Sequence, residues 1–158
     1  MMVQTLNGKA KRNDADSYAA NVGQWRTAIG NYNFTDDTGV AAAYTIFTVT
    51  GDVIVRVFGV CDVALTSGGV ATIELGVSGN TAVLLAQATA TDLILNEIWH
   101  DASPTTTVEQ VNLTGRDFIV TGGQDVILTI GTADLTAGDV DFYALWIPLS
   151  TDGNVVAA

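Results

Sequence analysis

The sequence has few of the residues that most often carry chemistry. Cys61 is its single cysteine and His100 its single histidine in 158 residues. A disulfide within the chain needs two cysteines, and a zinc site needs three or four histidine or cysteine ligands. We therefore expect no disulfide, no metal and no cofactor. Cys61 lies in an apolar run, which indicates a buried and reduced thiol.

Long apolar runs are also missing, although 48% of the residues are hydrophobic. The longest run, FYALWIPL at 142–149, is of strand length, and a membrane helix needs about 20 apolar residues. The N-terminal segment has no apolar core of the kind found in a secretory signal. We expect no membrane partner.

Basic residues are scarce, with six against 17 acidic residues and a net charge of −11. Residues 1–26 hold four basic and two acidic residues, so the rest of the chain carries a net charge of −13. A body this acidic repels nucleic acid, and we expect no nucleic-acid partner. The basic start is suited to an acidic protein surface, such as the body of another copy, or is simply a solvated tail.

Residues 1–30 are predicted to form an N-terminal arm. Tyr18, Val22, Trp25 and Ile29 recur at spacings of four, three and four, which is typical of one helix face. A short helix and an ordered extended arm both fit this segment. Trp25 indicates docking, because a free tail gains nothing from a buried indole. The predicted partner-binding residues of the arm are Lys9, Lys11, Arg12, Tyr18, Trp25 and Arg26.

Residues 31–158 are predicted to form an all-β domain, because β-branched residues are abundant and turn sequences separate short runs. We expect an antiparallel β-sandwich or jelly roll of about eight strands, with a helical turn within 89–96. The expected strands lie near 41–50, 52–65, 70–77, 81–87, 96–100, 105–113, 117–121, 124–131 and 140–149.

Several of these strands are apolar on both faces. In 70–77 the apolar residues alternate with Thr72 and Glu74, as expected for a strand with one wet face. The segments 53–60, 126–130 and 142–149 instead have apolar residues at both odd and even positions. A single sandwich covers only one face, so the arm or a neighbouring subunit must cover the other. We predict a homo-oligomer with cyclic symmetry.

The stretch NEIWHDASP at 96–104 places the only histidine between Glu97 and Asp101. If it is a strand, Glu97 and Trp99 share one face while His100 points the other way, which weakens an acid–base pair. No G-x-S-x-G turn or second histidine is present to complete a nucleophilic site. We interpret the stretch as a structural corner anchored by Trp99, with His100 at most a pH-sensitive contact.

Acidic residues are the remaining candidates for chemistry. Asp139 and Asp141 lie two apart on one strand, Asp36 and Asp37 are adjacent, and Asp134 lies in a turn. Carboxylates are the ligands that calcium prefers, and a pair of them is the catalytic group of a glycosidase. Neither the spacing of an EF-hand nor a cluster of aromatic and polar residues typical of a sugar site accompanies them. We interpret them as solvated turn carboxylates.

Three segments, FTVTGDVIVRVFGVCDVAL, GNTAVLLAQATATDLILNEIWHDASP and DFYALWIPLSTDGNVVAA, resemble small β-rich structural proteins of tailed-bacteriophage virions. The resemblance covers roughly residues 44–158 and is closest to capsid decoration, or cement, proteins. It implies a location on the virion surface, a trimer over three-fold positions of the shell, and termini that reach across neighbouring capsid subunits. It carries over no functional residue.

The function we expect is therefore non-enzymatic: binding and stabilising a phage capsid as a homotrimer, with the arm as a clamp. The expected partners are the major capsid protein and the chain itself. Trp99, Phe58 and Tyr143 are the predicted core or subunit-interface anchors. The alternatives are a tail, neck or baseplate component, and a carbohydrate-binding or adhesin module that would use Tyr32, Tyr143 and Trp99.

Overall fold

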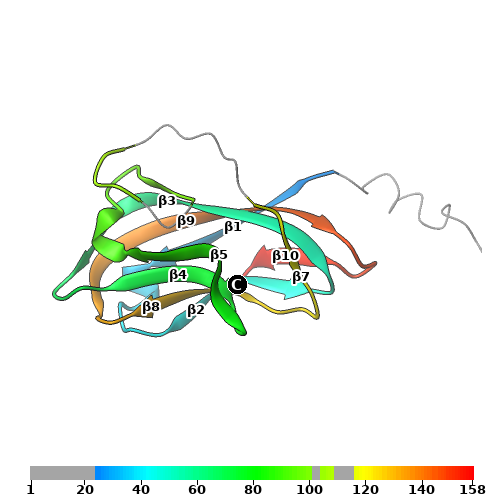
Figure 1. Cartoon of the computed structure of the whole chain (residues 1–158), viewed down its shortest axis with the longest axis horizontal. Helices are drawn as coiled ribbons and strands as arrows, with labels where there is room; N and C mark the ends of the chain where they lie inside the picture. The colour runs from blue at the N-terminus through cyan, green and yellow to red at the C-terminus, as the bar shows by residue number, and fades with distance from the viewer. Residues whose placement is uncertain (1–23, 101–103, 109–115) are drawn as a thin grey trace, which may run out of the picture.

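Two facing β-sheets make up the described part of the chain. The computed structural model describes residues 24–100, 104–108 and 116–158. Its ten strands in these ranges form two five-stranded antiparallel sheets, which Figure 1 shows one above the other. The predicted all-β antiparallel sandwich is confirmed.

The first sheet has the order β1-β9-β3, with β6 and β7 both paired to the far side of β3. The second has the order β10-β2-β8-β4-β5. The strands of the first sheet are β1 (Arg26–Asn33), β9 (Leu135–Pro148), β3 (Val53–Ser67), β6 (Ile98–Trp99) and β7 (Phe118–Val120). Those of the second are β10 (Asn154–Ala157), β2 (Ala43–Thr50), β8 (Val126–Gly131), β4 (Thr72–Val77) and β5 (Asn80–Thr89).

The chain wraps around the core by crossing repeatedly between the sheets. Most strands that are consecutive in sequence lie in opposite sheets: β1 is followed by β2, β3 by β4, β5 by β6 and β8 by β9. This wrapping is that of a jelly roll. It makes β9 the centre of the first sheet, where Trp146 pairs with Arg26 on one side and Val55 on the other.

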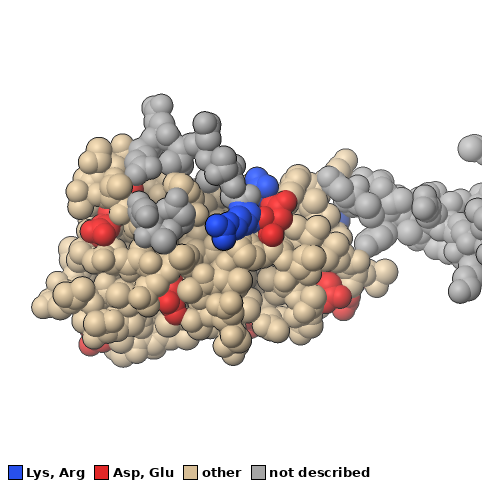
Figure 2. All heavy atoms as spheres, viewed as in Figure 1, with Lys and Arg blue, Asp and Glu red and all other residues tan. Residues whose placement is uncertain are grey.

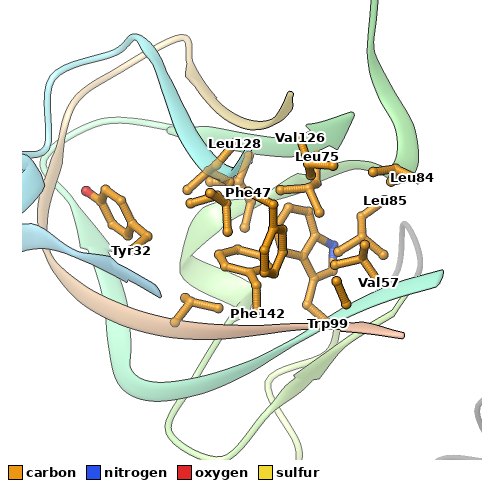
Figure 3. Close-up of a cluster of buried hydrophobic side chains, with 14 of the residues drawn as sticks. Tyr32, Phe47, Val57, Leu75, Leu84, Leu85, Trp99, Val126, Leu128 and Phe142 are labelled. Atoms are coloured by element: carbon orange, nitrogen blue, oxygen red, sulfur yellow. The ribbon is translucent and has the colours of Figure 1, made fainter. Parts of the chain in front are cut away.

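The core lies between the two sheets and is built from alternate residues of each strand. Trp99 is fully buried and meets the ring of Phe142 edge-on, with 6.0 Å between the ring centroids. Figure 3 shows Phe47 and Leu85 in the same cluster, so side chains from both sheets interlock around Trp99. Burial of this kind is the main source of stability in a chain without a disulfide.

Of the two forms that fit the arm, a short helix and an ordered extended segment, the structure has the extended one from Arg26 on. Residues 26–33 are strand β1, which pairs with β9 over eight residues, so the sandwich begins before residue 31. Two inward positions of β1 hold the small residues Ala28 and Gly30, while the third, Tyr32, is large and fully buried. A Cβ at Gly30 would lie 2.6 Å from the carbonyl oxygen of Ile46 in the facing sheet. Close approach of the sheets therefore removes the apolar alternation that marks a strand in sequence.

Eight of the nine predicted strands correspond to β2–β9, with shifted ends. The predicted helical turn is the 3-10 helix η1 (Ala90–Asp92). The prediction at 105–113 fails where it can be checked, because residues 104–108 contain no strand and 109–115 lie outside the described residues. The short helix α2 (Phe34–Asp37) and strand β10 were not expected. Within the described residues, no helix is long and apolar enough to span a membrane.

Candidate interaction surface

The outer face of the first sheet carries large apolar side chains. Along β9 the buried residues Phe142, Ala144 and Trp146 alternate with half-buried Tyr143 and Leu145 on the opposite face. Along β3 the buried positions Val53, Val55 and Val57 alternate in the same way with half-buried Ile54, Arg56 and Phe58. Two of the three strands predicted from sequence to be apolar on both faces are thus neighbours in one sheet.

The register joins these side chains into rows across the sheet. Tyr143 lies between Ile29 of β1 and Phe58 of β3, and the rings of Phe58 and Tyr143 stack with 5.2 Å between centroids and planes 10° apart. The next row toward one end contains Leu145, and the row after it places Ile147 beside Ile54.

Ile119 of β7 pairs with Ile54 and extends that row to the edge of the sheet. Ile119 is 65% exposed and Ile29 is 54% exposed, so the surface ends in open apolar side chains. We call the outward side chains of β1, β9, β3 and β7 the sheet-one face: Thr27, Ile29, Ile54, Arg56, Phe58, Val60, Ile119, Tyr143, Leu145 and Ile147.

Charged groups on and beside this face have partners. The Arg56 guanidinium donates from Nε and Nη2 to Oδ1 of Asp117, at 3.0 and 2.8 Å. It also lies over the ring of Trp25, 5.4 Å from the ring centroid. The site therefore holds a cation that is paired on one side and stacked on the other.

The carboxylates at the other end of β9 are held by amides. Asn31 donates from Nδ2 to Asp139 and Asp141, at 2.6 and 2.9 Å, and Asn33 donates to the second oxygen of Asp139 at 2.6 Å. These two carboxylates are cross-strand hydrogen-bond acceptors, which is a more specific role than the solvated turn groups we expected. Within the described ranges, no three histidine, cysteine or acidic residues gather as metal ligands.

The outer face of the second sheet is polar by comparison. Glu74 of β4 accepts hydrogen bonds from Thr81 and Gln87 of β5, and lies beside Thr129 of β8. Ile127 is the apolar exception on β8, half-buried next to Gly76. On the outer face of 126–130, Ile127 is thus the one large apolar side chain. The continuous apolar surface belongs to the first sheet.

Positive charge gathers on the side of the first sheet. The described residues contain three basic and thirteen acidic side chains, a net charge of −10. Arg56 is on the sheet-one face and pairs with Asp117, and Arg116 immediately precedes Asp117 in the chain. Arg26 of β1 lies over the ring of Trp146, 5.0 Å from the ring centroid. Figure 2 shows blue atoms gathered beside red ones on this side of the molecule, while the other red atoms are scattered.

Two of the six predicted arm residues fall within the described structure. Trp25, 43% exposed, stacks on Arg56, and Arg26 begins β1. Lys9, Lys11, Arg12 and Tyr18 lie outside the described residues. The structure thus brings Trp25 to Arg56 of the sheet-one face, whereas Arg26 lies over the inward-facing ring of Trp146.

Of the predicted anchors, Phe58 and Tyr143 form the stacked pair on the sheet-one face, while Trp99 is a core residue. Trp99 and Tyr32 are each fully buried. Two of the three aromatics that a sugar-binding site would use are therefore inaccessible, which is against the carbohydrate-binding alternative.

The stretch around His100 has the arrangement we expected. Glu97 and Trp99 both point inward and are fully buried, while Ile98 and His100 are half-buried on the other side. Glu97 accepts a hydrogen bond from the backbone N–H of Thr105 at 3.0 Å, which ties down the chain beyond the corner. Asp101 lies outside the described residues.

Cys61 is fully buried on the inner face of β3, and burial raises the pKa of its thiol to about 11. The thiol donates to the carbonyl oxygen of Val63 at 3.2 Å. A protonated and inaccessible thiol is a poor nucleophile, so its place in the structure is that of a small core residue.

A pocket of about 220 Å³ opens between the β4–β5 turn and β7. Val77, Val83 and Phe118 line it together with Ile119, which also belongs to the sheet-one face. Its volume is below the roughly 300–1,000 Å³ usual for small-molecule sites. The pocket is better described as a recess at the rim of the sheet-one face.

No protein family and no curated protein matches the sequence. Among solved structures, the chain is similar to "Cyanophage Pam1 capsid asymmetric unit", with 18% sequence identity and a TM-score of 0.46. The match covers 80% of this chain and 86% of that chain.

Proposed function

We propose that this chain is a non-enzymatic structural protein of a virus particle, which binds the capsid shell as a decoration protein. It acts as a homotrimer, and its partners are the major capsid protein and its own copies. The single observation that carries the proposal is the sheet-one face, which is apolar from Ile29 on β1 to Ile119 on β7. A surface of this kind is typical of a protein that works in an assembly.

The sequence resemblance supports the particular kind of assembly. Its three segments include most of β3 and β9, which contribute to both the core and the sheet-one face, and β5, which contributes Leu84 and Leu85 to the core. A shell protein needs a rigid body and a surface for neighbours more than it needs a cleft. Both are present in the described residues, with the recess at β7 as a minor feature.

The arm supplies the contact with the shell in this proposal. Lys9, Lys11 and Arg12 are a compact basic cluster joined to a body with a net charge of −10 in its described part. Opposite charges on arm and body direct the arm toward an acidic partner, and such attraction weakens as salt rises.

Binding to empty shells tests the proposal. Capsid shells assembled without this chain are mixed with the purified protein and sedimented, and bound copies are counted per shell. We expect hundreds of copies, whereas a few copies per particle indicate a tail, neck or baseplate position. Failure of the full chain to sediment with shells contradicts the capsid role.

A charge variant tests the role of the arm. The triple variant Lys9→Gln, Lys11→Gln, Arg12→Gln lowers the net charge by three, and we expect it to lose most shell occupancy at moderate salt. The matched control lowers the net charge equally at exposed positions of the body: Ser78→Asp, Thr106→Asp and Asn154→Asp. Equal loss in both variants means that overall charge, rather than the arm, governs binding.

A further inference from the structure

We infer that the sheet-one face is the surface through which copies of this chain associate, so that the first sheets of neighbouring subunits pack against one another. The inference deepens the proposed function. It takes from that function only the expectation that a shell protein works in several copies. It names the surface and its occupant: a second copy of this chain.

Chemical composition is the first argument. The centre of the face is the stacked pair Phe58 and Tyr143, flanked by Ile29 and Leu145. Aromatic residues at the centre of a patch and few unpaired charges are the signature of protein interfaces. The opposite face of the molecule, with Glu74 bonded to Thr81 and Gln87, has the polar character of a solvated surface.

Charge is the second argument, because it shows on which side two copies can approach. Two bodies with a net charge of −10 repel each other over most of their surfaces. On the sheet-one face Arg56 neutralises Asp117, so repulsion is reduced there. At the far end, Asp139 and Asp141 keep their charges while accepting hydrogen bonds from Asn31 and Asn33. Copies can therefore approach each other most closely at the Arg56 end of this face.

Area is the third argument. Residues 141–147 of β9 extend for about 20 Å, and the four-strand path is about 19 Å wide at about 4.8 Å per strand. The flat footprint is then about 400 Å², half of the roughly 800 Å² that each partner buries in a standard interface. A neighbour must cover the whole face together with its rim. Trp25 and Ile119, both largely exposed, are the apolar side chains available there.

The chain's own N-terminal segment is the competing occupant, since it joins the sandwich at this rim beside Trp25. Residues 1–23 contain three basic and two acidic side chains, all at positions 9–16, between two short apolar groups at 1–6 and 18–22. Covering an apolar sheet with such a segment would remove charges from water without partners. A second copy offers matching apolar rows instead.

The native mass of the full chain, measured without any capsid shell, is the test. The expected mass at micromolar concentration is a multiple of 16.5 kDa. The double variant Ile29→Glu, Ile119→Glu places carboxylates on two exposed positions of the face, and we expect about a 100-fold weaker association or more, because each charge would be buried unpaired. The control Val156→Glu replaces a 46% exposed aliphatic residue on the second sheet, and we expect its mass to be unchanged.

A second measurement keeps the inference testable if the double variant folds poorly. A photo-crosslinking residue at Tyr143 in the full chain should give intermolecular products with peptides of β1, β3 or β9. A 16.5 kDa monomer at every concentration overturns the inference. So does a crosslink to residues 1–23 of the same chain, or a multimer that the double variant leaves intact. A monomer would also remove the homotrimer from the proposed function, whereas shell binding is tested separately by sedimentation.

Discussion

Replacing Trp99 tests the core directly. Trp99 is fully buried, and its ring meets Phe142 edge-on in the space between the two sheets. Truncating a buried tryptophan to alanine costs about 3–5 kcal/mol, as the sum of lost transfer free energy and the cavity left behind. A domain of this size has a free energy of unfolding of about 5–15 kcal/mol, so Trp99→Ala removes a large part of it.

Thermal unfolding is the assay, with protein concentration held constant because association shifts the midpoint. At about 2–4 °C per kcal/mol for this length, Trp99→Ala should lower Tm by about 6–20 °C. Trp25→Ala is the matched control: Trp25 is 43% exposed, and its loss should change stability by less than about 1 kcal/mol.

The variant Trp99→Phe separates packing from polarity. The indole Nε1 of Trp99 is buried and has no hydrogen-bond partner among the described residues. Phenylalanine keeps much of the ring and removes this unpaired donor, so it should cost clearly less than alanine. If Trp99→Ala changes stability by less than about 1 kcal/mol, Trp99 does not anchor the core and the reasoning from burial is refuted.

Three further substitutions or treatments follow from particular contacts. Burial and a pKa of about 11 should keep Cys61 unreactive toward a thiol reagent at pH 8 in the native protein and make it fully reactive in denaturant, and rapid native labelling would contradict this. Arg56→Ala removes the pair with Asp117 and the contact with Trp25, so we expect a cost below about 1 kcal/mol together with a change in tryptophan emission; unchanged emission would contradict the contact with Trp25. Gly76→Ala should destabilise the protein by more than about 1 kcal/mol in urea unfolding, because its Cβ would collide with the backbone of Asn80 and Thr81, whereas Gly79→Ala, with open space around it, should change little.

Composition and turn sequences predict most of the sandwich, and the reason is visible in β3 and β9. Both strands are apolar at odd and even positions, so they are recognised as strand-length runs rich in β-branched and aromatic residues rather than by alternation. Strand β1 was missed because Ala28 and Gly30 occupy inward positions, where close approach to the facing sheet admits only small side chains. Its outward residue Ile29 then fell into a helical spacing by coincidence with Tyr18, Val22 and Trp25.

The candidate surface was predictable in part. Apolar residues on both faces of β3 and β9 predicted that something covers the second face, and Phe58 and Tyr143 were named in advance. Sequence does not show which strands are neighbours, so the row from Ile29 to Phe58 emerges only from the register. The hydrogen bonds from Asn31 and Asn33 to β9 span more than 100 residues, which no local pattern reveals.

The position of β9 sets the order in which the sandwich can be completed during synthesis. Strand β1 ends at Asn33 and pairs only with β9, which begins at Leu135, so its partner leaves the ribosome about 5–20 s later at about 5–20 residues per second. Strand β3 waits with apolar side chains on both faces during most of that interval. Before the first sheet can close, the nascent chain therefore exposes β3, a long segment that is apolar on both faces. This segment is where a chaperone would bind.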